Sequence, residues 1–323
     1  MKKIINYIIT FAVGVMFTSY SYAKKIDKLD LFIPPVGIGL LMADAAKDQE
    51  LKKYVNNINV VRWNNPDQLR AGIIDGSIDI TFVPSYVAAN FYNKGIKFKM
   101  LNIITGGILY IISTDKSIKT IQDLKGKTVI VPFQNDMPDL VLKAMIKKLK
   151  INNINIKYVA TPNVAVKMAL SGKADTLLIP EVAGTKIQII AKKKKGITFY
   201  RSINLSKEYG RIFNTKPYIP QAGVAVREEF ANNHPKFLKA LNETMKKSAK
   251  ALLSDENRVI KITNSIWKNQ GEIFAKSIKH WNMQVDSASK VKPEIEFFYN
   301  IMYNLKPAII GGKLPSDDFY MDY

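Results

Sequence analysis

The sequence predicts an α/β protein made of two similar lobes, each built on a parallel sheet. Two observations predict this class. Short apolar segments alternate with helical segments along the chain, which favours parallel strands joined by helices. The order of signals in segment 66–84 also returns in segment 162–180: a proline, a helical stretch, a glycine, an aspartate, an apolar run and a second proline. The prolines and aspartates keep the same offsets in both segments, so the two halves are expected to fold alike.

Prolines and glycines mark the elements of the first unit. Proline ends a strand because it has no N–H for the ladder, and glycine commonly follows the last turn of a helix. The expected elements are a strand ending at Pro34, a helix over 39–54, a strand over 58–63, a helix ending at Gly76 and a strand over 78–83.

The second unit repeats these elements about 100 residues later along the chain. The expected elements are a strand ending at Pro132, a helix over 138–149, a strand over 156–160, a helix ending at Gly172 and a strand over 174–179. Each unit can cover its own parallel sheet with helices, so each is expected to form the centre of one lobe.

The remaining segments predict how the lobes are joined. A strand over 108–113 is expected to pass into the second lobe, and a strand over 221–226 to cross back. Lobe 1 would then comprise 24–107 and 221–323, and lobe 2 would be 108–220. Two crossing strands of this kind form a hinge. A further strand is expected over 197–201, and helices over 235–253, 255–279 and 287–303.

The first 23 residues have the pattern of a secretory signal peptide. Lys2 and Lys3 precede an apolar run over 4–17, and Ser21 and Ala23 are small residues at the −3 and −1 positions of a cleavage site. The alternative, a membrane anchor, needs about 18–20 apolar residues to span. The mature chain is therefore expected to begin near Lys24 and to be exported in soluble form, which suggests the periplasm.

Composition and charge exclude several classes of site. The chain has no cysteine and two histidines, which excludes disulfides, thiolate nucleophiles and cysteine-based metal sites and argues against a multi-histidine metal site. Its net charge is +21, and the excess is largest in the middle third, which contains Lys192 to Lys195. Because these lysines are not interleaved with aromatics, we expect a solvated surface that affects solubility and contact with anionic membranes, and no binding of nucleic acid.

Four segments, taken in order and with their spacing, resemble a known family. They are 69–79, 121–133, 169–181 and 312–320. With them the chain resembles the periplasmic solute-binding proteins of ABC importers, in the group that includes nitrate, taurine, alkanesulfonate and thiamine-precursor binders. The resemblance implies the type 2 periplasmic binding fold, whose lobes close on a small molecule and deliver it to a membrane permease with a cytoplasmic ATPase. It does not identify the ligand. The two crossing strands lead us to expect a monomer that closes on its ligand, and the residues suggest no catalytic group, cofactor or metal.

The candidate ligand residues come from the loops that follow the strands, because ligands of open α/β sheets bind beyond the carboxyl ends of strands. The family's ligand loops fall on the same segments. In lobe 1 the candidates are Pro35, Val36, Gly37, Ser85 and Tyr86; in lobe 2 they are Phe133, Gln134, Asn135, Asp136 and Glu181.

These candidates favour a neutral or cationic ligand with a flat ring over sulfonate or nitrate. Tyr86 and Phe133 are suited to stacking, Asp136 and Glu181 to accepting N–H groups, and the set contains no arginine or lysine. Structural roles stay open: Asp136 as a helix N-cap, Glu181 as a structural carboxylate, and core packing for both aromatics. Trp63 is expected to pack rather than to line the cleft.

Two other functions on the same scaffold are less well supported. The resemblance extends to cytoplasmic enzymes of thiamine pyrimidine and menaquinone synthesis. The former need a cysteine-rich motif that this chain lacks, and a signal peptide is out of place in the latter. A ligand sensor is the remaining alternative, which a fused receptor or kinase segment would favour. The sequence therefore predicts a binding protein and not an enzyme.

Overall fold

The computed structural model describes residues 25–34, 37–63 and 66–323. The expected signal peptide at 1–23 and the candidate residues Pro35 and Val36 lie outside the described residues.

The first sheet has six strands in the order β11-β4-β10-β3-β1-β2. β1 lies parallel to β2 and β3, whereas β10 is antiparallel to β3 and β4, and β11 is antiparallel to β4. Its strands come from both ends of the chain: β1 (Ile26–Ile33), β2 (Val55–Arg62), β3 (Ile80–Pro84), β4 (Phe98–Thr105), β10 (Ala222–Arg227) and β11 (Met283–Ser287). We call the lobe around this sheet lobe 1.

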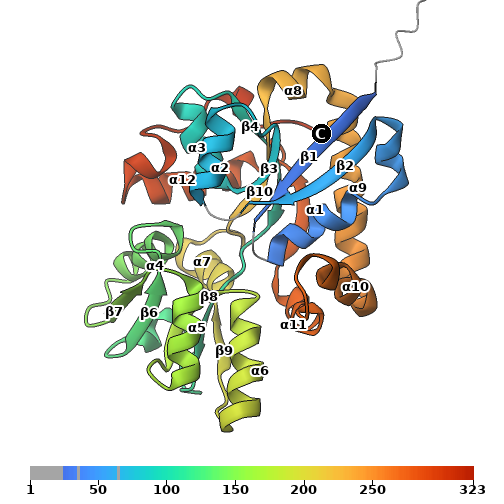
Figure 1. Ribbon diagram of the computed structural model, residues 1–323. Helices are drawn as coiled ribbons and strands as arrows, with labels where there is room; N and C mark the ends of the chain where they lie inside the picture. The colour runs from blue at the N-terminus through green and yellow to red at the C-terminus, as the bar shows by residue number, and fades with distance from the viewer. Residues whose placement is uncertain (1–24, 35–36, 64–65) are drawn as a thin grey trace, which may run out of the picture.

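The second sheet has five strands in the order β7-β6-β8-β5-β9 and forms lobe 2. β6 is parallel to β7 and β8, and β5 is antiparallel to β8 and β9. The strands are β5 (Leu109–Ser113), β6 (Thr128–Pro132), β7 (Asn155–Val159), β8 (Thr176–Pro180) and β9 (Tyr200–Asn204). The predicted two-sheet α/β class is confirmed, and Figure 1 shows the two lobes one above the other.

Helices cover both sheets. In lobe 1 they are α1 (Leu40–Ala45), α2 (Pro66–Ile74), α3 (Ser85–Asn93), α8 (Glu228–Asn233), α9 (Pro235–Ser254), α10 (Glu256–Ile266), α11 (Gly271–Ser277) and α12 (Lys292–Tyr303). In lobe 2 they are α4 (Met137–Lys148), α5 (Pro162–Ser171), α6 (Ala183–Lys195) and α7 (Leu205–Phe213). Short 3-10 turns cover Gly37–Gly39, Gln49–Lys53, Ile121–Leu124, Ile278–His280, Pro307–Ile310 and Asp317–Phe319. None of the helices among the described residues is long and apolar enough to cross a membrane.

Two predicted helices are broken by local side-chain hydrogen bonds. The segment expected to be helical over 39–54 divides because the Asp48 carboxylate accepts from the Glu50 N–H at 2.9 Å and starts a separate 3-10 turn. The segment expected over 255–279 divides because the Asn264 side chain accepts from Gly271 N at 2.9 Å, which begins α11 as a new helix. β4 and β11 were not among the strands expected.

The two connections between the lobes run side by side. Ile219 N donates to Gly106 O at 2.8 Å, and Ile108 N donates to the Gln221 side chain at 3.0 Å. Gly107 lies between β4 and β5 at φ +113°, and a Cβ there would stand 2.2 Å from Ser206 Oγ. Glycine is therefore required at this crossing. Because the connections are bonded to each other, they place the two sheets on either side of one junction.

Candidate functional site

The carboxyl ends of the parallel strands in both sheets face each other between the lobes. Gly37, which follows β1, lies against Val182, which follows β8. Tyr86, which follows β3, reaches Asp136, which follows β6. The loops predicted from the sequence to bind ligand are thus loops through which the lobes touch. We call this contact region between the two lobes, which lie one above the other in Figure 1, the cleft.

Tyr86 and Asp136 form a direct bridge across the cleft. The Tyr86 hydroxyl donates to Asp136 Oδ1 at 2.6 Å. Asp136 is also the N-cap of α4, where the same oxygen accepts from Met137 N at 2.7 Å. Burial, followed by the charge of the neighbouring Asp136 carboxylate, raises the pKa of the Tyr86 hydroxyl well above its ordinary value. Tyr86 is therefore a neutral donor, and Asp136 serves the helix and the opposite lobe at once.

Asn135 lies beside this bridge and carries a second contact between the lobes. The Lys306 ammonium, from the loop after α12, donates to Asn135 O at 2.9 Å. Asn135 has φ +58° and donates its own N–H to Asp139 Oδ2 at 2.8 Å, so the loop before α4 is held from within lobe 2. Lys306 is exposed, and it brings a positive charge to the cleft rim that the candidate set lacked.

Gly37 allows the lobes to approach closely on the other flank. A Cβ at this position would lie 2.5 Å from Val182 Cγ2 and 3.0 Å from the Trp281 ring. Trp281 is buried and its indole N–H donates to Ser277 Oγ at 3.0 Å. The glycine thus lies between the other lobe and a fixed aromatic wall of its own lobe.

Glu181 is not available as a free carboxylate. It is 4% exposed, and its Oε1 accepts from Arg201 Nε at 2.7 Å while its Oε2 accepts from Thr185 Oγ1 at 2.7 Å. Arg201, on β9, also donates to Thr185 Oγ1 at 2.7 Å. The carboxylate is neutralised inside lobe 2, so the negative charge expected at this place in the cleft is balanced by a guanidinium.

Arg201 is linked to lobe 1 through Tyr110. Its guanidinium lies 5.5 Å from the centroid of the Tyr110 ring, and the Tyr110 hydroxyl donates to His280 O at 2.9 Å. Asn204 donates to the same hydroxyl at 3.1 Å. Burial, with the charges of Arg201 and Lys279, lowers the pKa of His280 to about 4. Burial also raises the pKa of Tyr110, helped by the charge of Glu181.

Ser85 lies at the base of the cleft and is fully buried. Its hydroxyl donates to Pro220 O at 2.6 Å, its N–H donates to Gln221 O at 3.1 Å, and its carbonyl accepts from the Tyr299 hydroxyl at 2.7 Å. These partners fix the start of α3 against the chain that crosses back to lobe 1. Ser85 therefore positions Tyr86.

Phe133 and Gln134 are exposed at the carboxyl end of β6. Phe133 is 39% exposed and adopts φ +60°, and its N–H donates to Val159 O at 3.1 Å. Trp63, at the end of β2, is 8% exposed and packs in the lobe 1 core; within the described residues its indole N–H has no acceptor.

Five residues at the cleft were not among the ligand residues predicted from the sequence: Tyr110, Arg201, His280, Trp281 and Lys306. All five lie outside the strand-end loops in which ligand residues were sought, on β5, on β9 and in segments around 280 and 306. The signal that was available for Arg201 is its rarity, because it is the only arginine among the 17 basic residues over 105–205.

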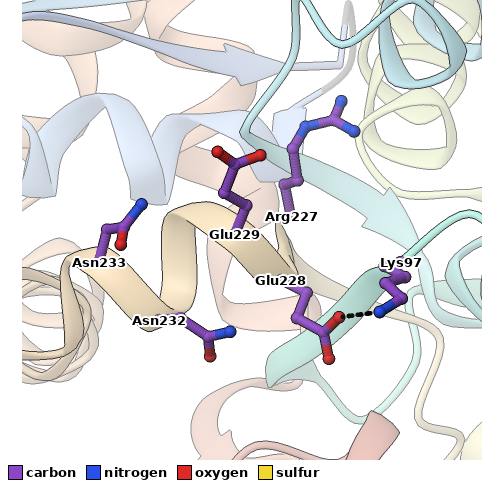
Figure 2. A pocket seen from close by; sticks show the side chains of 6 residues that line it. All are labelled: Lys97, Arg227, Glu228, Glu229, Asn232 and Asn233. Atoms are coloured by element: carbon purple, nitrogen blue, oxygen red, sulfur yellow. Dashed lines mark ion pairs between the residues drawn. The ribbon is translucent and has the colours of Figure 1, made fainter.

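A hollow of about 440 Å³ lies on lobe 1 at the edge of the sheet away from the cleft. Figure 2 shows its lining side chains, which are Lys97, Arg227, Glu228, Glu229, Asn232 and Asn233. Arg227 is held by Asp79 and by the carbonyl of Ile78, and Glu228 pairs with Lys97 and Lys99. These charges are balanced locally, so the hollow is a weaker candidate than the cleft.

Comparisons with known proteins agree with this geometry. A family model described as NMT1/THI5 like matches residues 105–258. No curated protein sequence matches the chain. A crystal structure from Parabacteroides distasonis described as an ABC transporter is similar over 93% of this chain and 99% of that one, with a TM-score of 0.75 and 20% identity.

Two further structures extend the likeness. The alkanesulfonate-binding protein of Xanthomonas axonopodis, bound to MOPS, covers 92% of this chain and 99% of its own, with TM-score 0.67 and 14% identity. The periplasmic nitrate-binding protein of Synechocystis covers 78% and 70%, with TM-score 0.57 and 12% identity. The chain thus has the fold of periplasmic binding proteins. This confirms the resemblance to that group that the four sequence segments indicated.

Proposed function

We propose that the protein is the periplasmic solute-binding component of an ABC importer. In this proposal lobe 1 (24–107 and 221–323) and lobe 2 (108–220) close on a small molecule, and the monomer delivers it to a permease with a cytoplasmic ATPase. The Tyr86–Asp136 hydrogen bond is the main support for this proposal. It joins two loops at the strand ends of different sheets, and the chain crosses from one sheet to the other and back. The fold of the similar structures supports it.

The ligand we propose is a neutral or cationic compound with a flat ring. Exposed Phe133 and half-buried Tyr86 offer ring faces, and Asp136 is the carboxylate of the candidate set that has no basic partner among the described residues. Glu181 no longer supports this preference, because Arg201 neutralises it. A flat cation or an N–H donor would bond Asp136 Oδ2, while Tyr86 and Met137 N donate to Oδ1.

Thermal-shift screening of the purified protein tests the binding function. Ligand at 100 times its dissociation constant adds about 2.7 kcal/mol to the free energy of unfolding, which should raise the melting temperature by a few degrees. The panel would contain pyrimidines and other ring-containing cations, aliphatic and aromatic sulfonates, and nitrate. If no compound of any class raises the melting temperature, the proposal of a binding protein loses its support.

Calorimetry on Asp136→Asn then tests the ligand class. For a cationic or N–H-rich ligand the affinity should fall about tenfold or more, because a charge-assisted hydrogen bond contributes about 1.5–3 kcal/mol. For an anion it should rise, since a repelling charge is removed. The matched control is Asp115→Asn, which removes one carboxylate at the opposite edge of lobe 2 and should leave affinity unchanged. N-terminal sequencing of the exported protein tests cleavage before Lys24.

A further inference from the structure

The loops of lobe 2 that lie farthest from the cleft gather at one edge of its sheet. β6, β7 and β8 are parallel, and β5 is antiparallel to both β8 and β9, so loops 114–127, 149–154, 172–175 and 196–199 meet at one edge. α4 and α6 also end here, because both begin at the cleft. In Figure 1, α6 runs away from lobe 1 and ends at the lower tip of lobe 2.

This edge carries a dense set of exposed lysines, and we call it the lysine edge. Its exposed members are Lys116, Lys119, Lys125, Lys148, Lys150, Lys173, Lys192, Lys193, Lys194 and Lys195. Among the described residues, none of them forms an ion pair, whereas nearby Lys127 is paired with Asp115 at 2.7 Å. Lysines at helix ends complement the helix dipole, but that effect is confined to the last turn and does not account for the loop lysines.

Few carboxylates balance this charge. Asp115 is taken by Lys127, and Asp123 accepts the backbone N–H groups of Lys119 and Thr120 at 2.9 and 2.8 Å. Asp175 is the remaining carboxylate of the four loops. The excess of positive charge in the middle third of the chain is therefore concentrated on a single surface, and that surface points away from the cleft.

The chemistry of the lysine edge fits a smooth anionic surface better than a nucleic acid. The four loops and the end of α6 contain neither arginine nor an aromatic residue ahead of buried Phe199. Nucleic-acid sites combine positive charge with aromatic stacking and with the bidentate fork of arginine. Lysine is a flexible point charge, and several lysines spread over loop tips can engage phosphates in no fixed arrangement.

We propose that the lysine edge binds the surface of a lipid bilayer that contains anionic phospholipids. Adsorption through this edge holds the protein close to the membrane while the cleft, at the other edge of lobe 2, stays open to solvent. It also leaves lobe 1 free to move relative to lobe 2. The surface is independent of ligand, so the proposal stands apart from the ligand class suggested above.

Vesicle co-sedimentation tests it with the purified full chain. Vesicles with about 30% phosphatidylglycerol in phosphatidylcholine should bind the protein near 50 mM salt, and binding should weaken strongly near 300 mM as the charges are screened. Each lysine close to such a surface contributes about fivefold to partition. The variant K192Q/K193Q/K194Q/K195Q should therefore lose about tenfold or more, and pure phosphatidylcholine should bind neither protein.

The matched control removes four exposed lysines of lobe 1 from one helix, as K236Q/K239Q/K247Q/K250Q on α9. It changes net charge by the same amount and should retain vesicle binding within about twofold. Equal loss in both variants would show a general effect of net charge and overturn the proposal. An absence of vesicle binding would also overturn the proposal. The same holds if the protein binds duplex DNA or RNA instead of vesicles and the α6 variant loses that binding. Melting temperatures equal to the parent's would confirm that both variants are folded.

Discussion

The Tyr86 hydroxyl and the Asp136 carboxylate, 2.6 Å apart, join two sheets that share no strand. Tyr86 belongs to the first turn of α3 in lobe 1, and Asp136 caps α4 in lobe 2. Because the aspartate is anchored by its own helix, the bridge holds the lobes together without ordering a flexible side chain on that side. If the lobes open and close as proposed, opening must break this polar contact.

Tyr86→Phe removes this contact and keeps the ring. A hydrogen bond to a charged group contributes about 1.5–3 kcal/mol when buried, and a half-buried one contributes less. We expect the ligand-free protein to open more often, which raises its radius of gyration in small-angle scattering. Apparent ligand affinity should fall about tenfold, because only the closed fraction holds the ligand fully.

Tyr92→Phe is the control, since Tyr92 is also on α3 but its hydroxyl bonds Ser316 Oγ at 2.6 Å within lobe 1. Its scattering curve should match the parent's. If Tyr86→Phe and the parent give the same radius of gyration with and without ligand, the bridge does not govern closure.

A glycine pair gives a second test of lobe closure. Gly37→Ala places a methyl group 2.5 Å from Val182 Cγ2 in the other lobe, whereas Gly39→Ala places one 3.0 Å from Ile33 Cβ in its own lobe. Because valine is restricted at χ1, the first clash is relieved most easily by separation of the lobes. Gly37→Ala should therefore weaken ligand binding, and its contact at 3.0 Å with the Trp281 ring of its own lobe should also lower the melting temperature.

Gly39→Ala should lower the melting temperature but leave the affinity of the remaining folded protein close to the parent's. Overpacking within a core costs about 1–3 kcal/mol. Calorimetry and thermal unfolding on the two variants separate these effects. An equal loss of affinity in both would mean that the contact of Gly37 with Val182 has no special part in closure.

The sequence predicted the order of most strands correctly because apolar runs, prolines and glycines act locally. Gly172, for example, ends α5 in the left-handed conformation at φ +79°, as its position after a helical stretch indicated. Strands β4 and β11 were missed. β4 is buried along nearly its whole length, so it shows no alternation, and β11 is a short strand between the helices expected over 255–279 and 287–303.

The side chains of the site were less predictable than the strands. Ser85 satisfies its hydroxyl with Pro220, and Glu181 satisfies its carboxylate with Arg201 on a different strand. Neither partner lies near in sequence, so the residues were read as exposed polar groups facing a ligand. Position at a strand end therefore indicated where the cleft is, while long-range pairing decided which of its polar groups remain available.

Arg201→Met tests the assignment of Glu181 as a structural carboxylate. The substitution leaves a buried charge with Thr185 as its hydrogen-bond partner, and breaking a buried pair in this way costs about 3–5 kcal/mol. We expect a clearly lower urea midpoint. The double variant Glu181→Gln with Arg201→Met should recover part of the loss, because no charge is then left unpaired.

Lys53→Met is the surface control, since the Lys53–Glu50 pair is solvent-exposed and such pairs contribute about 0–1 kcal/mol. Measured midpoints that fall equally for Arg201→Met and Lys53→Met would contradict the structural role of Glu181, and the carboxylate would return as a candidate for ligand binding.

The lowered pKa of His280 leads us to expect that acid favours separation of the lobes. His280 lies where lobe 1 meets lobe 2: its carbonyl accepts from Tyr110, and the Tyr110 ring stands edge-on to its own at 6.2 Å. Burial, then the charges of Arg201 and Lys279, lowers its pKa to about 4. Separation of the lobes returns the imidazole to water, where its pKa is about 6.5. The open and unfolded states therefore bind the proton more tightly than the closed state.

The sign of the effect follows from this difference. The contribution of His280 to the closed state is complete above about pH 6.5 and is lost as the pH falls toward 4. Because the side chain is only partly buried, we expect a loss of about 1 kcal/mol near pH 5.

Small-angle scattering of the ligand-free protein should show a larger radius of gyration at pH 5 than at about pH 7.5. His280→Gln should remove much of that change, whereas His234→Gln, which alters a ring packed on Phe230 within lobe 1, should not. Carboxylates titrate in the same range, so the decisive quantity is the difference between each variant and the parent. A parent and a His280→Gln variant that expand equally on acidification would show that His280 does not couple protons to closure.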